Sequence, residues 1–172
     1  MYSLTAVMPF YNEEDFLQES FERLHSSGVA DKILLVDDSS TDRSKEIAKN
    51  IADKYINVSY FLNKSNKGKG SALISIKEHI QTSHMVIHDA DLEYDPNDLI
   101  KLKKLSIKNK NSLILGSRFI GSIERNNLYK STHAANQFLS LLFSIINSYK
   151  ITDIATCYKM FPTKFFKNTN FK

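Results

Sequence analysis

The stretch HMVIHDADLEYDP, residues 84–96, joins an apolar run to a series of alternating acids. The run MVI is typical of a buried strand, and Asp89, Asp91, Glu93 and Asp95 follow at every second position. Alternate residues of an extended chain point to the same side, so we expect at least the first carboxylates to converge. Two carboxylates about 5 Å apart repel by roughly 3 kcal/mol at an effective dielectric of ~20. A bound cation would turn that repulsion into coordination.

Strand-like and helix-like segments alternate on both sides of this stretch. Strands are predicted at 4–10, 32–38, 58–63, 84–90, 112–118 and around 157–161. Helices are predicted at 13–27, 40–55, 69–82, 95–110 and 133–148. This order indicates an α/β protein with a mostly parallel sheet and helices on both faces. Right-handed crossovers place the loops after the strands at one edge, where ligands bind in such sheets.

Length and charge narrow the class of protein. A chain of 172 residues suits one domain with a core of its own. Seventeen of the 19 acids lie in residues 1–100, whereas residues 101–132 carry eight Lys or Arg against the single acid Glu124. This asymmetry fits a site that combines a cation with phosphates, or a basic face for anionic lipid. The lysines of 101–110 also fit a solvated helix face.

The sequence also bears on cellular location. The single cysteine, Cys157, excludes an internal disulfide and fits a reducing compartment. The opening residues do not resemble a signal peptide. The longest apolar run, FLSLLFSII at 138–146, is half of the ~18–20 residues that a membrane span requires. We expect this run to pack into a core, with a position on a membrane surface as the alternative, and we predict a cytoplasmic protein, peripheral on the cytoplasmic face of the membrane.

Two loops at the predicted sheet edge suit a nucleotide. Asp37 and Asp38 end the second predicted strand, where a carboxylate can accept hydrogen bonds from a nucleobase or a ribose. Alternatively, this segment only begins a helix, with Ser40 or Asp42 as its cap. The segment NKSNKGKG, 63–70, offers glycines and lysines to an anion, although neither P-loop nor GxGxxG spacing is present. A basic surface turn explains the same residues.

The acids after the fourth predicted strand suit a metal ion. Mg²⁺ and Mn²⁺ prefer carboxylate oxygens and commonly take one or two ligands from the protein. We therefore expect Asp89, Asp91 and Glu93 to bind one of these ions. The alternative is that Asp95 caps the next helix before Pro96 while the other acids point into solvent.

Basic residues follow the fifth predicted strand. Arg118 of GSRF lies at the same predicted edge, and the guanidinium fork suits a phosphate. An ion pair with a nearby acid is the alternative for Arg118. Arg125, Lys130 and His133 follow in a polar segment and are further candidates for phosphate binding.

Taken together, the motifs PFYNEE, VDDSSTD, NKGKGSA, DADLEYDP, GSRF and TD-TCYK resemble, in this order, the family 2 glycosyltransferases of GT-A fold, in particular the dolichyl-phosphate mannose or glucose synthase branch. The resemblance covers about residues 3–167. It implies one GT-A (Rossmann-like) catalytic domain over 1–172, with a nucleotide-sugar-binding part at 1–118 and an acceptor-side part at 119–172, where truncation is left open. It further implies a nucleotide-sugar site at Pro9, Tyr11, Asn12, Glu13, Val36, Asp37, Asp38, Lys67, Gly68, Asp89, Ala90 and Asp91.

The resemblance also implies a reaction. A sugar moves with inversion from a donor of the GDP-mannose or UDP-glucose type to a polyprenyl or dolichyl phosphate at the membrane surface, in cell-envelope glycan synthesis. Mg²⁺ or Mn²⁺ on Asp89, Asp91 and Glu93 binds the donor diphosphate. Asp91, Arg118 and Asp153 are the implied catalytic residues, with Asp153 as a base if the acceptor is a sugar hydroxyl.

Two departures from the family pattern affect these expectations. Ser39 replaces a usual glycine, which we expect to be tolerated if its backbone is not left-handed. Ala155 stands where relatives often have an acid. A non-catalytic nucleotide-sugar-binding domain and a nucleotidyltransferase remain alternatives, and a membrane-anchoring partner or a missing C-terminal segment is left open. No nucleic-acid partner is expected.

Overall fold

The computed structural model describes residues 1–120 and 130–170, and for 130–133 it describes the backbone alone. The chain forms two compact units. Unit 1 comprises Met1–Ile114 and Met160–Lys172, and unit 2 comprises Leu115–Lys159. The sequence placed a division at residue 118, and that functional partition stays a prediction.

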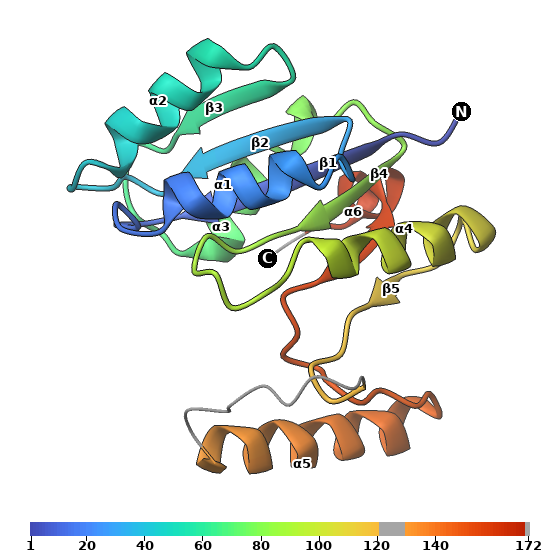
Figure 1. Cartoon of the computed structure of the whole chain (residues 1–172). Helices are drawn as coiled ribbons and strands as arrows, with labels where there is room; N and C mark the ends of the chain where they lie inside the picture. Colours follow the sequence, from blue (N-terminus) through green and yellow to red (C-terminus); the bar gives the residue numbers. More distant parts are fainter. Residues whose placement is uncertain (121–129, 171–172) are drawn as a thin grey trace. The chain divides into compact units, whose positions relative to one another are not determined.

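Unit 1 is built on a twisted sheet with the strand order β3-β2-β1-β4-β6-β5 (Figure 1). The strands are β1 (Leu4–Phe10), β2 (Lys32–Asp37), β3 (Val58–Leu62), β4 (His84–Ile87), β5 (Ile114–Leu115) and β6 (Lys159–Pro162). Strands β1 to β4 pair in parallel, and β6 runs antiparallel to β4. Phe10 lies opposite Asp37, and Val7 lies opposite Ile87. The loops that follow β1, β2 and β4 therefore meet at one edge.

Helices cover both faces of this sheet. They are α1 (Leu17–Ser26), α2 (Ser44–Lys54), α3 (Lys69–Ser75) with the short 3₁₀ helix η1 (Lys77–His79), α4 (Asn97–Lys108) and α6 (Thr163–Asn168). The crossovers from β1 to β2 and from β2 to β3 move along the sheet in one direction, and the crossover from β3 to β4 moves back. Since such crossovers are right-handed, α1 and α2 lie on one face and α3 lies on the other (Figure 1).

The core explains why the central strands are continuously apolar. Every residue of β1 is buried, because helices exclude water from both sides of the strand. Phe21 and Leu24 of α1, Met85 of β4 and Leu99 of α4 are almost fully buried against the sheet. Burial of such side chains contributes about 1.5–3 kcal/mol each. The mostly parallel α/β architecture predicted from the sequence is confirmed.

The boundaries of the elements differ from the predictions in several places. The first helix begins at Leu17, four residues later than expected, and the helix predicted at 69–82 is divided into α3 and η1. The strand predicted at 112–118 is reduced to β5. Helix α6 was not predicted.

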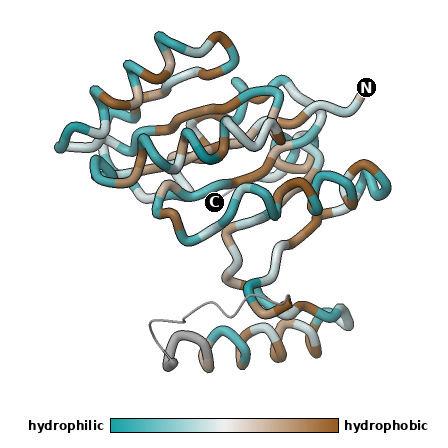
Figure 2. The backbone as a smooth tube through the Cα atoms, viewed as in Figure 1, coloured by the Kyte–Doolittle hydropathy of each residue, from teal (hydrophilic) through white to brown (hydrophobic). Residues whose placement is uncertain are grey.

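Unit 2 contains α5 (Lys130–Asn147) and the segments on either side of it. Figure 2 shows hydrophobic residues repeated along this helix. The expectation that 138–146 packs into a core is wrong, because Phe138, Ile145 and Ile146 are 65%, 69% and 70% exposed. The buried side of α5 is polar instead. Asn136 and Ser140 face inward because they accept hydrogen bonds from the backbone N–H groups of Ala155 and Ile154.

Candidate functional site

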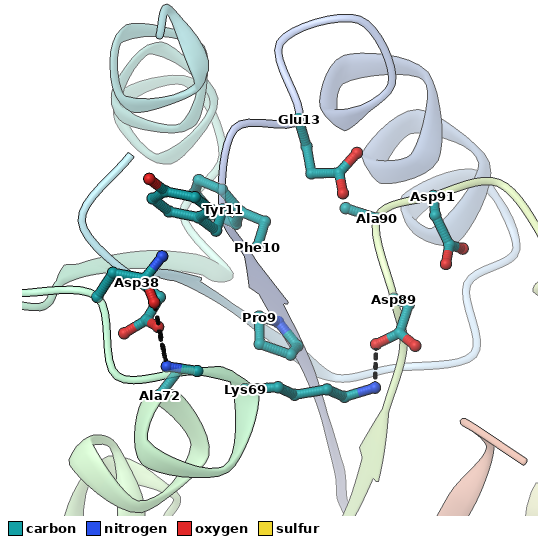
Figure 3. Close-up of a pocket in the computed structure, with 12 residues that line it drawn as sticks. Pro9, Phe10, Tyr11, Glu13, Asp38, Lys69, Ala72, Asp89, Ala90 and Asp91 are labelled. Atoms are coloured by element: carbon teal, nitrogen blue, oxygen red, sulfur yellow. Dashed lines mark hydrogen bonds and ion pairs between the residues drawn. The ribbon is translucent and has the colours of Figure 1, made fainter. Parts of the chain in front are cut away.

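A pocket of about 320 Å³ lies in unit 1 at the carboxyl ends of β1, β2 and β4 (Figure 3). Its size is in the range of small-molecule sites, and its position is where ligands bind in parallel sheets. The lining residues are Pro9, Phe10, Tyr11, Glu13, Asp38, Asn66, Gly68, Lys69, Ala72, Asp89, Ala90 and Asp91. Eight of these belong to the predicted nucleotide-sugar set, and Asn12, Val36, Asp37 and Lys67 of that set do not line the pocket.

Asp38 shapes one wall of the pocket. Its side chain is almost completely buried, and Oδ1 accepts a hydrogen bond from Asn63 Nδ2 at 2.8 Å. Oδ2 accepts the backbone N–H groups of Lys67 at 3.0 Å and Gly68 at 2.6 Å. Gly68 has a φ of 85°, which glycine adopts without strain. A carboxylate offers about four acceptor positions, so one remains for a ligand while three hold the loop.

Asp37 lies behind the pocket, whereas its neighbour Asp38 lines it. Its side chain is fully buried and accepts hydrogen bonds from Tyr60 Oη at 2.9 Å and from the backbone N–H of Ser40 at 2.7 Å. Burial, and then the Asp37 carboxylate, raise the pKa of Tyr60. Val36 is also fully buried in the sheet. These contacts give Asp37 and Val36 supporting positions behind the pocket and do not favour direct contact with a ligand.

The loop after β1 is tied to the start of α2. Asn12 Oδ1 accepts the backbone N–H of Thr41 at 2.8 Å, and the backbone N–H of Glu13 donates to Ser44 Oγ at 2.8 Å. Asp42 Oδ1 accepts the N–H of Ser44, the first residue of α2, whereas the N-cap position is Arg43 and has no side-chain cap, so Asp42 is not the predicted cap itself. These bonds position Tyr11 and Glu13 at the pocket.

Ser39 does not meet the condition on which its tolerance was predicted. Its φ is 71°, which is the left-handed region that disfavours residues with a Cβ. A serine here carries the strain of a left-handed backbone, which a glycine would not. A Ser39→Gly substitution should relieve this strain, which a measurement of the free energy of unfolding can test.

The acids after β4 do not continue the strand. β4 ends at Ile87, and Leu92 has a φ of 59°, so the side chains no longer alternate as they would in an extended chain. Asp89 and Asp91 line the pocket, whereas Glu93 is exposed and lies outside the lining. Asp95 Oδ1 accepts the backbone N–H of Asn97 at 2.9 Å. The N-cap position of α4 is Pro96 and has no side-chain cap, so Asp95 bonds the start of the helix from outside the predicted cap position. The arrangement does not favour Glu93 as a ligand.

The pocket has an excess of negative charge. Four lining residues are carboxylates (Glu13, Asp38, Asp89 and Asp91), and Lys69 is the single Lys or Arg among the twelve lining residues. Burial, followed by the charges of Asp91, Asp42 and Asp89, raises the pKa of Glu13. Lys69 Nζ forms an ion pair with Asp89 Oδ1, drawn as a dashed line in Figure 3. Such a pocket attracts cations.

Two carboxylates of the pocket offer the kind of oxygen atom that a divalent metal ion prefers. Asp89 and Asp91 supply hard carboxylate oxygens to one wall of the pocket. Within residues 1–120 and 134–170, no three His, Cys, Asp or Glu side chains form a metal-binding group. Mg²⁺ commonly binds through one or two carboxylates and completes its coordination with phosphates and water. The residues therefore fit a Mg²⁺ or Mn²⁺ that binds together with a diphosphate.

The basic residues predicted for phosphate binding belong to unit 2, where Arg118 is paired with Asp153. Arg118 Nε and Nη2 donate to Asp153 at 2.9 and 3.0 Å, the backbone N–H of Arg118 donates at 3.0 Å, and Asn136 Nδ2 donates at 2.7 Å. This is the ion-pair alternative considered for Arg118. Arg125 lies outside the described residues, as do the side chains of Lys130 and His133.

This network argues against Asp153 as a general base. The Asp153 side chain is 0% exposed. Burial raises the pKa of this carboxyl, but the hydrogen bonds from Arg118 and Asn136 outweigh burial and leave the pKa below its usual value. A carboxylate of lowered basicity with four donors around it is a poor proton acceptor. Its position indicates a structural role in unit 2.

Comparison with known proteins identifies the family of this chain. The model described as Glycosyl transferase family 2 matches residues 5–169. The chain belongs to glycosyl transferase family 2. A dolichol-phosphate mannosyltransferase of Pyrococcus furiosus is 33% identical over 131 residues, which cover 74% of this chain and 37% of that relative. An undecaprenyl-phosphate 4-deoxy-4-formamido-L-arabinose transferase of Edwardsiella ictaluri is 36% identical over 105 residues, 58% of this chain and 32% of that relative. The chain thus spans about a third of the length of these family members.

Solved structures share the fold. A mannosyltransferase from Pyrobaculum calidifontis in complex with GDP-Man and Mn²⁺ has a TM-score of 0.54 at 23% identity, over 62% of this chain and 33% of that chain. A glucosyl-3-phosphoglycerate synthase from Mycobacterium tuberculosis, in complex with Mn²⁺, UDP and phosphoglyceric acid, has a TM-score of 0.68 at 16% identity, over 95% of this chain and 56% of that chain. At these identities the similarity shows the GT-A fold alone.

Sequence reasoning missed four lining residues of this family 2 pocket, namely Phe10, Asn66, Lys69 and Ala72. Lys69 is the important omission. It belongs to the segment NKSNKGKG that the sequence had singled out, but Lys67 was chosen from that segment instead. The structure uses Lys67 through its backbone N–H and directs the side chain of Lys69 into the pocket. In unit 2, Asn136 had no recognisable signal, because a polar residue on an apolar helix is not by itself informative.

Proposed function

We propose that the chain carries the donor-binding part of an inverting glycosyltransferase that moves a sugar from a nucleotide-diphosphate donor to a polyprenyl phosphate. The donor is of the GDP-mannose or UDP-glucose type. The observation that carries the proposal is the pocket of unit 1, in which Asp89 and Asp91 share a wall at the edge formed by β1, β2 and β4. Family membership supports the reaction class.

The residues on each wall of the pocket would have a distinct role in this reaction. Asp89 and Asp91 would hold Mg²⁺ or Mn²⁺, which neutralises charge on the departing nucleoside diphosphate. Asp38 keeps one acceptor position for the nucleoside, and the ring of Tyr11 lies on the same side of the pocket (Figure 3). An acceptor phosphate is already anionic and needs no general base. The engagement of Asp153 with Arg118, and the presence of Ala155, are compatible with such an acceptor.

The surface of α5 supports a position at a membrane. Seven large apolar side chains of this helix are exposed: Phe138, Leu139, Leu141, Leu142, Phe143, Ile145 and Ile146. No Lys, Arg, Asp or Glu occurs in residues 134–149, and the sequence of unit 2 carries five Lys or Arg against two acids. None of the helices in the described part of the chain is long and apolar enough to cross a bilayer. We propose that α5 lies on the surface of an anionic bilayer, with its apolar side chains among the lipids.

Metal-dependent nucleotide binding tests the donor site. Calorimetry with GDP and UDP, with and without Mn²⁺, should detect binding that Mn²⁺ strengthens. Asp91→Ala should abolish the Mn²⁺ effect and leave the thermal unfolding of the protein unchanged. Glu93→Ala is the matched control, since Glu93 lies two residues away and outside the pocket, and should bind as the wild type does. Wild-type binding without any response to Mn²⁺ would reject the metal assignment.

Product analysis tests the reaction. The protein is incubated with labelled GDP-mannose or UDP-glucose, Mn²⁺ and a short-chain polyprenyl phosphate. Glycolipid together with nucleoside diphosphate supports the proposal. Pyrophosphate as the product would indicate a nucleotidyltransferase, and nucleotide binding without any turnover would indicate a non-catalytic binding domain.

Vesicle binding tests the α5 surface. The chain should float with vesicles that contain anionic lipid, and Ile145→Ser combined with Ile146→Ser should reduce that binding. Ile56→Ser is the control, because Ile56 is an even more exposed isoleucine in unit 1. Equal flotation of all three proteins would contradict the proposed membrane contact.

A further inference from the structure

Lys69 is placed unusually for a surface lysine. It is the first residue of α3, and its side chain extends across the pocket toward the loop that follows β4 (Figure 3). There Nζ pairs with Asp89, one of the two carboxylates assigned to the metal ion. The Lys69 side chain is 46% exposed and that of Asp89 is 22% exposed, so both groups remain accessible to a ligand. The ammonium thus stands where a metal ion would bring positive charge.

We propose that Lys69 is a diphosphate-positioning residue that neutralises Asp89 until metal and donor arrive, and that it thereby makes their binding interdependent. The inference rests on the proposed function, because it requires a nucleoside diphosphate in this pocket. It assigns to Lys69 two successive partners. The first is Asp89 in the protein without donor, and the second is a phosphate oxygen of the donor.

The exchange follows from the charges of the pocket. A divalent ion that reaches Asp89 repels the ammonium, which must leave this carboxylate. The four-carbon stem of a lysine permits such a movement without a change in the backbone. A diphosphate bound to the same metal ion is the nearest new anion, and its oxygens accept the ammonium. Metal alone therefore displaces Lys69 from Asp89, whereas metal with diphosphate also offers the ammonium a new anion beside the metal ion.

Stabilisation of the fold does not explain well why Lys69 is paired with Asp89. Ion pairs between partly exposed side chains contribute little to stability because water solvates both partners and side-chain entropy is lost. Asp89 is already held by its backbone, since Ser20 Oγ donates to its carbonyl oxygen. The sheet edge would persist without the ion pair. The side chain of Lys69 is thus more important for the charge of the pocket than for the fold.

The test measures coupling between metal and nucleotide. Mn²⁺ binding is followed by the electron paramagnetic resonance of unbound Mn²⁺, with and without GDP or UDP, for the wild type, Lys69→Met, Lys69→Arg and Lys67→Met. The ratio of the two Mn²⁺ dissociation constants gives the coupling factor, which by linkage equals the effect of Mn²⁺ on the nucleotide. Lys67→Met is the matched control, because Lys67 lies in the same loop, outside the pocket lining, and keeps its backbone bond to Asp38.

For Lys69→Met, we expect Mn²⁺ to bind more tightly than to the wild type when no nucleotide is present. We expect the nucleotide to bind more weakly than to the wild type when Mn²⁺ is present. The coupling factor should therefore be about tenfold smaller. Lys69→Arg should retain part of the coupling, and Lys67→Met should retain all of it. A coupling factor in Lys69→Met equal to that of the wild type would overturn the inference. Absence of nucleotide binding to the wild type would instead overturn the proposed function, so the two failures are distinguishable.

Discussion

Replacement of Asp153 by asparagine separates the structural role of this carboxylate from the catalytic role that its sequence position implies. Asp153 accepts four hydrogen bonds, three from Arg118 and one from Asn136. Asp153→Asn removes the negative charge and turns an amide NH₂ toward groups that are themselves donors. The guanidinium of Arg118 then loses the carboxylate that neutralises its charge, at a position where its side chain is 25% exposed.

The size of the effect can be worked out from burial. Loss of one partner of a fully buried ion pair costs about 3–5 kcal/mol. The Arg118 side chain is 25% exposed, so water recovers part of that loss. We expect unit 2 to be destabilised by about 2–3 kcal/mol. In urea this lowers the unfolding midpoint by roughly 1–2 M at a typical slope for a small domain.

Two measurements report this change. Urea denaturation gives the free energy of unfolding, and amide hydrogen exchange reports on unit 2 if it unfolds separately from unit 1. The amides of Ile154 and Ala155 are suitable probes, because they donate to Ser140 and Asn136 of α5. Their protection should fall about 30-fold or more. Asp53→Asn, at an exposed position of α2, is the control and should change stability by less than about 0.5 kcal/mol.

The result that would refute this reasoning is a stable variant. If Asp153→Asn has the same urea unfolding curve and the same amide hydrogen exchange as the wild type, the ion pair with Arg118 does not stabilise unit 2. Loss of turnover with unchanged stability, together with loss of the acidic limb of the pH–rate profile, would restore Asp153 as the base.

Three further substitutions or conditions give independent tests. Ser39→Gly should raise the free energy of unfolding by about 0.5–1 kcal/mol, because relief of the left-handed strain exceeds the added entropy of glycine in the unfolded chain. Gly116→Ala should destabilise unit 2 by about 1–3 kcal/mol, since a Cβ there would lie 2.9 Å from Tyr158 Cβ; amide exchange would detect this, and wild-type protection would contradict it. Burial lowers the pKa of His84 and lowers that of His88 to about 4, so the unfolded chain binds protons more readily than the folded one, and the free energy of unfolding should fall as pH decreases below about 6.5. His84→Asn should remove the part of that dependence that His84 contributes in urea titrations from pH 5 to 8, and an equal slope in both proteins would assign the dependence to His88.

Much of unit 1 was predictable from local pattern. Short apolar runs bounded by polar turn residues favour buried strands, so β1, β2 and β4 begin where they were predicted to begin, although β4 ends earlier than predicted. The parallel order then predicted that Asp38, Asp89 and Asp91 lie at one edge of the sheet. Such runs can be recognised from neighbouring residues alone, without information on contacts between distant parts of the chain.

The errors arose where a side chain's direction depends on one dihedral angle or on a distant partner. Leu92, with its positive φ, turns the chain and separates Glu93 from the acids that line the pocket. Gly68 directs Lys69, rather than Lys67, toward Asp89. The inward side of α5 is the one that carries Asn136 and Ser140, because these side chains accept the backbone N–H groups of Ala155 and Ile154, which no local pattern reveals.

The amino-acid sequence by itself determined the order of strands and helices, the edge at which the acids gather and the family to which the chain belongs. Only the tertiary structure decided which carboxylates reach the pocket, which lysine balances them, and that Arg118 and Asp153 neutralise each other. The physical reason is the separation along the sequence of the residues that interact. Hydrophobic periodicity acts over a few neighbouring residues, whereas ion pairs and buried hydrogen bonds join residues that only folding brings together.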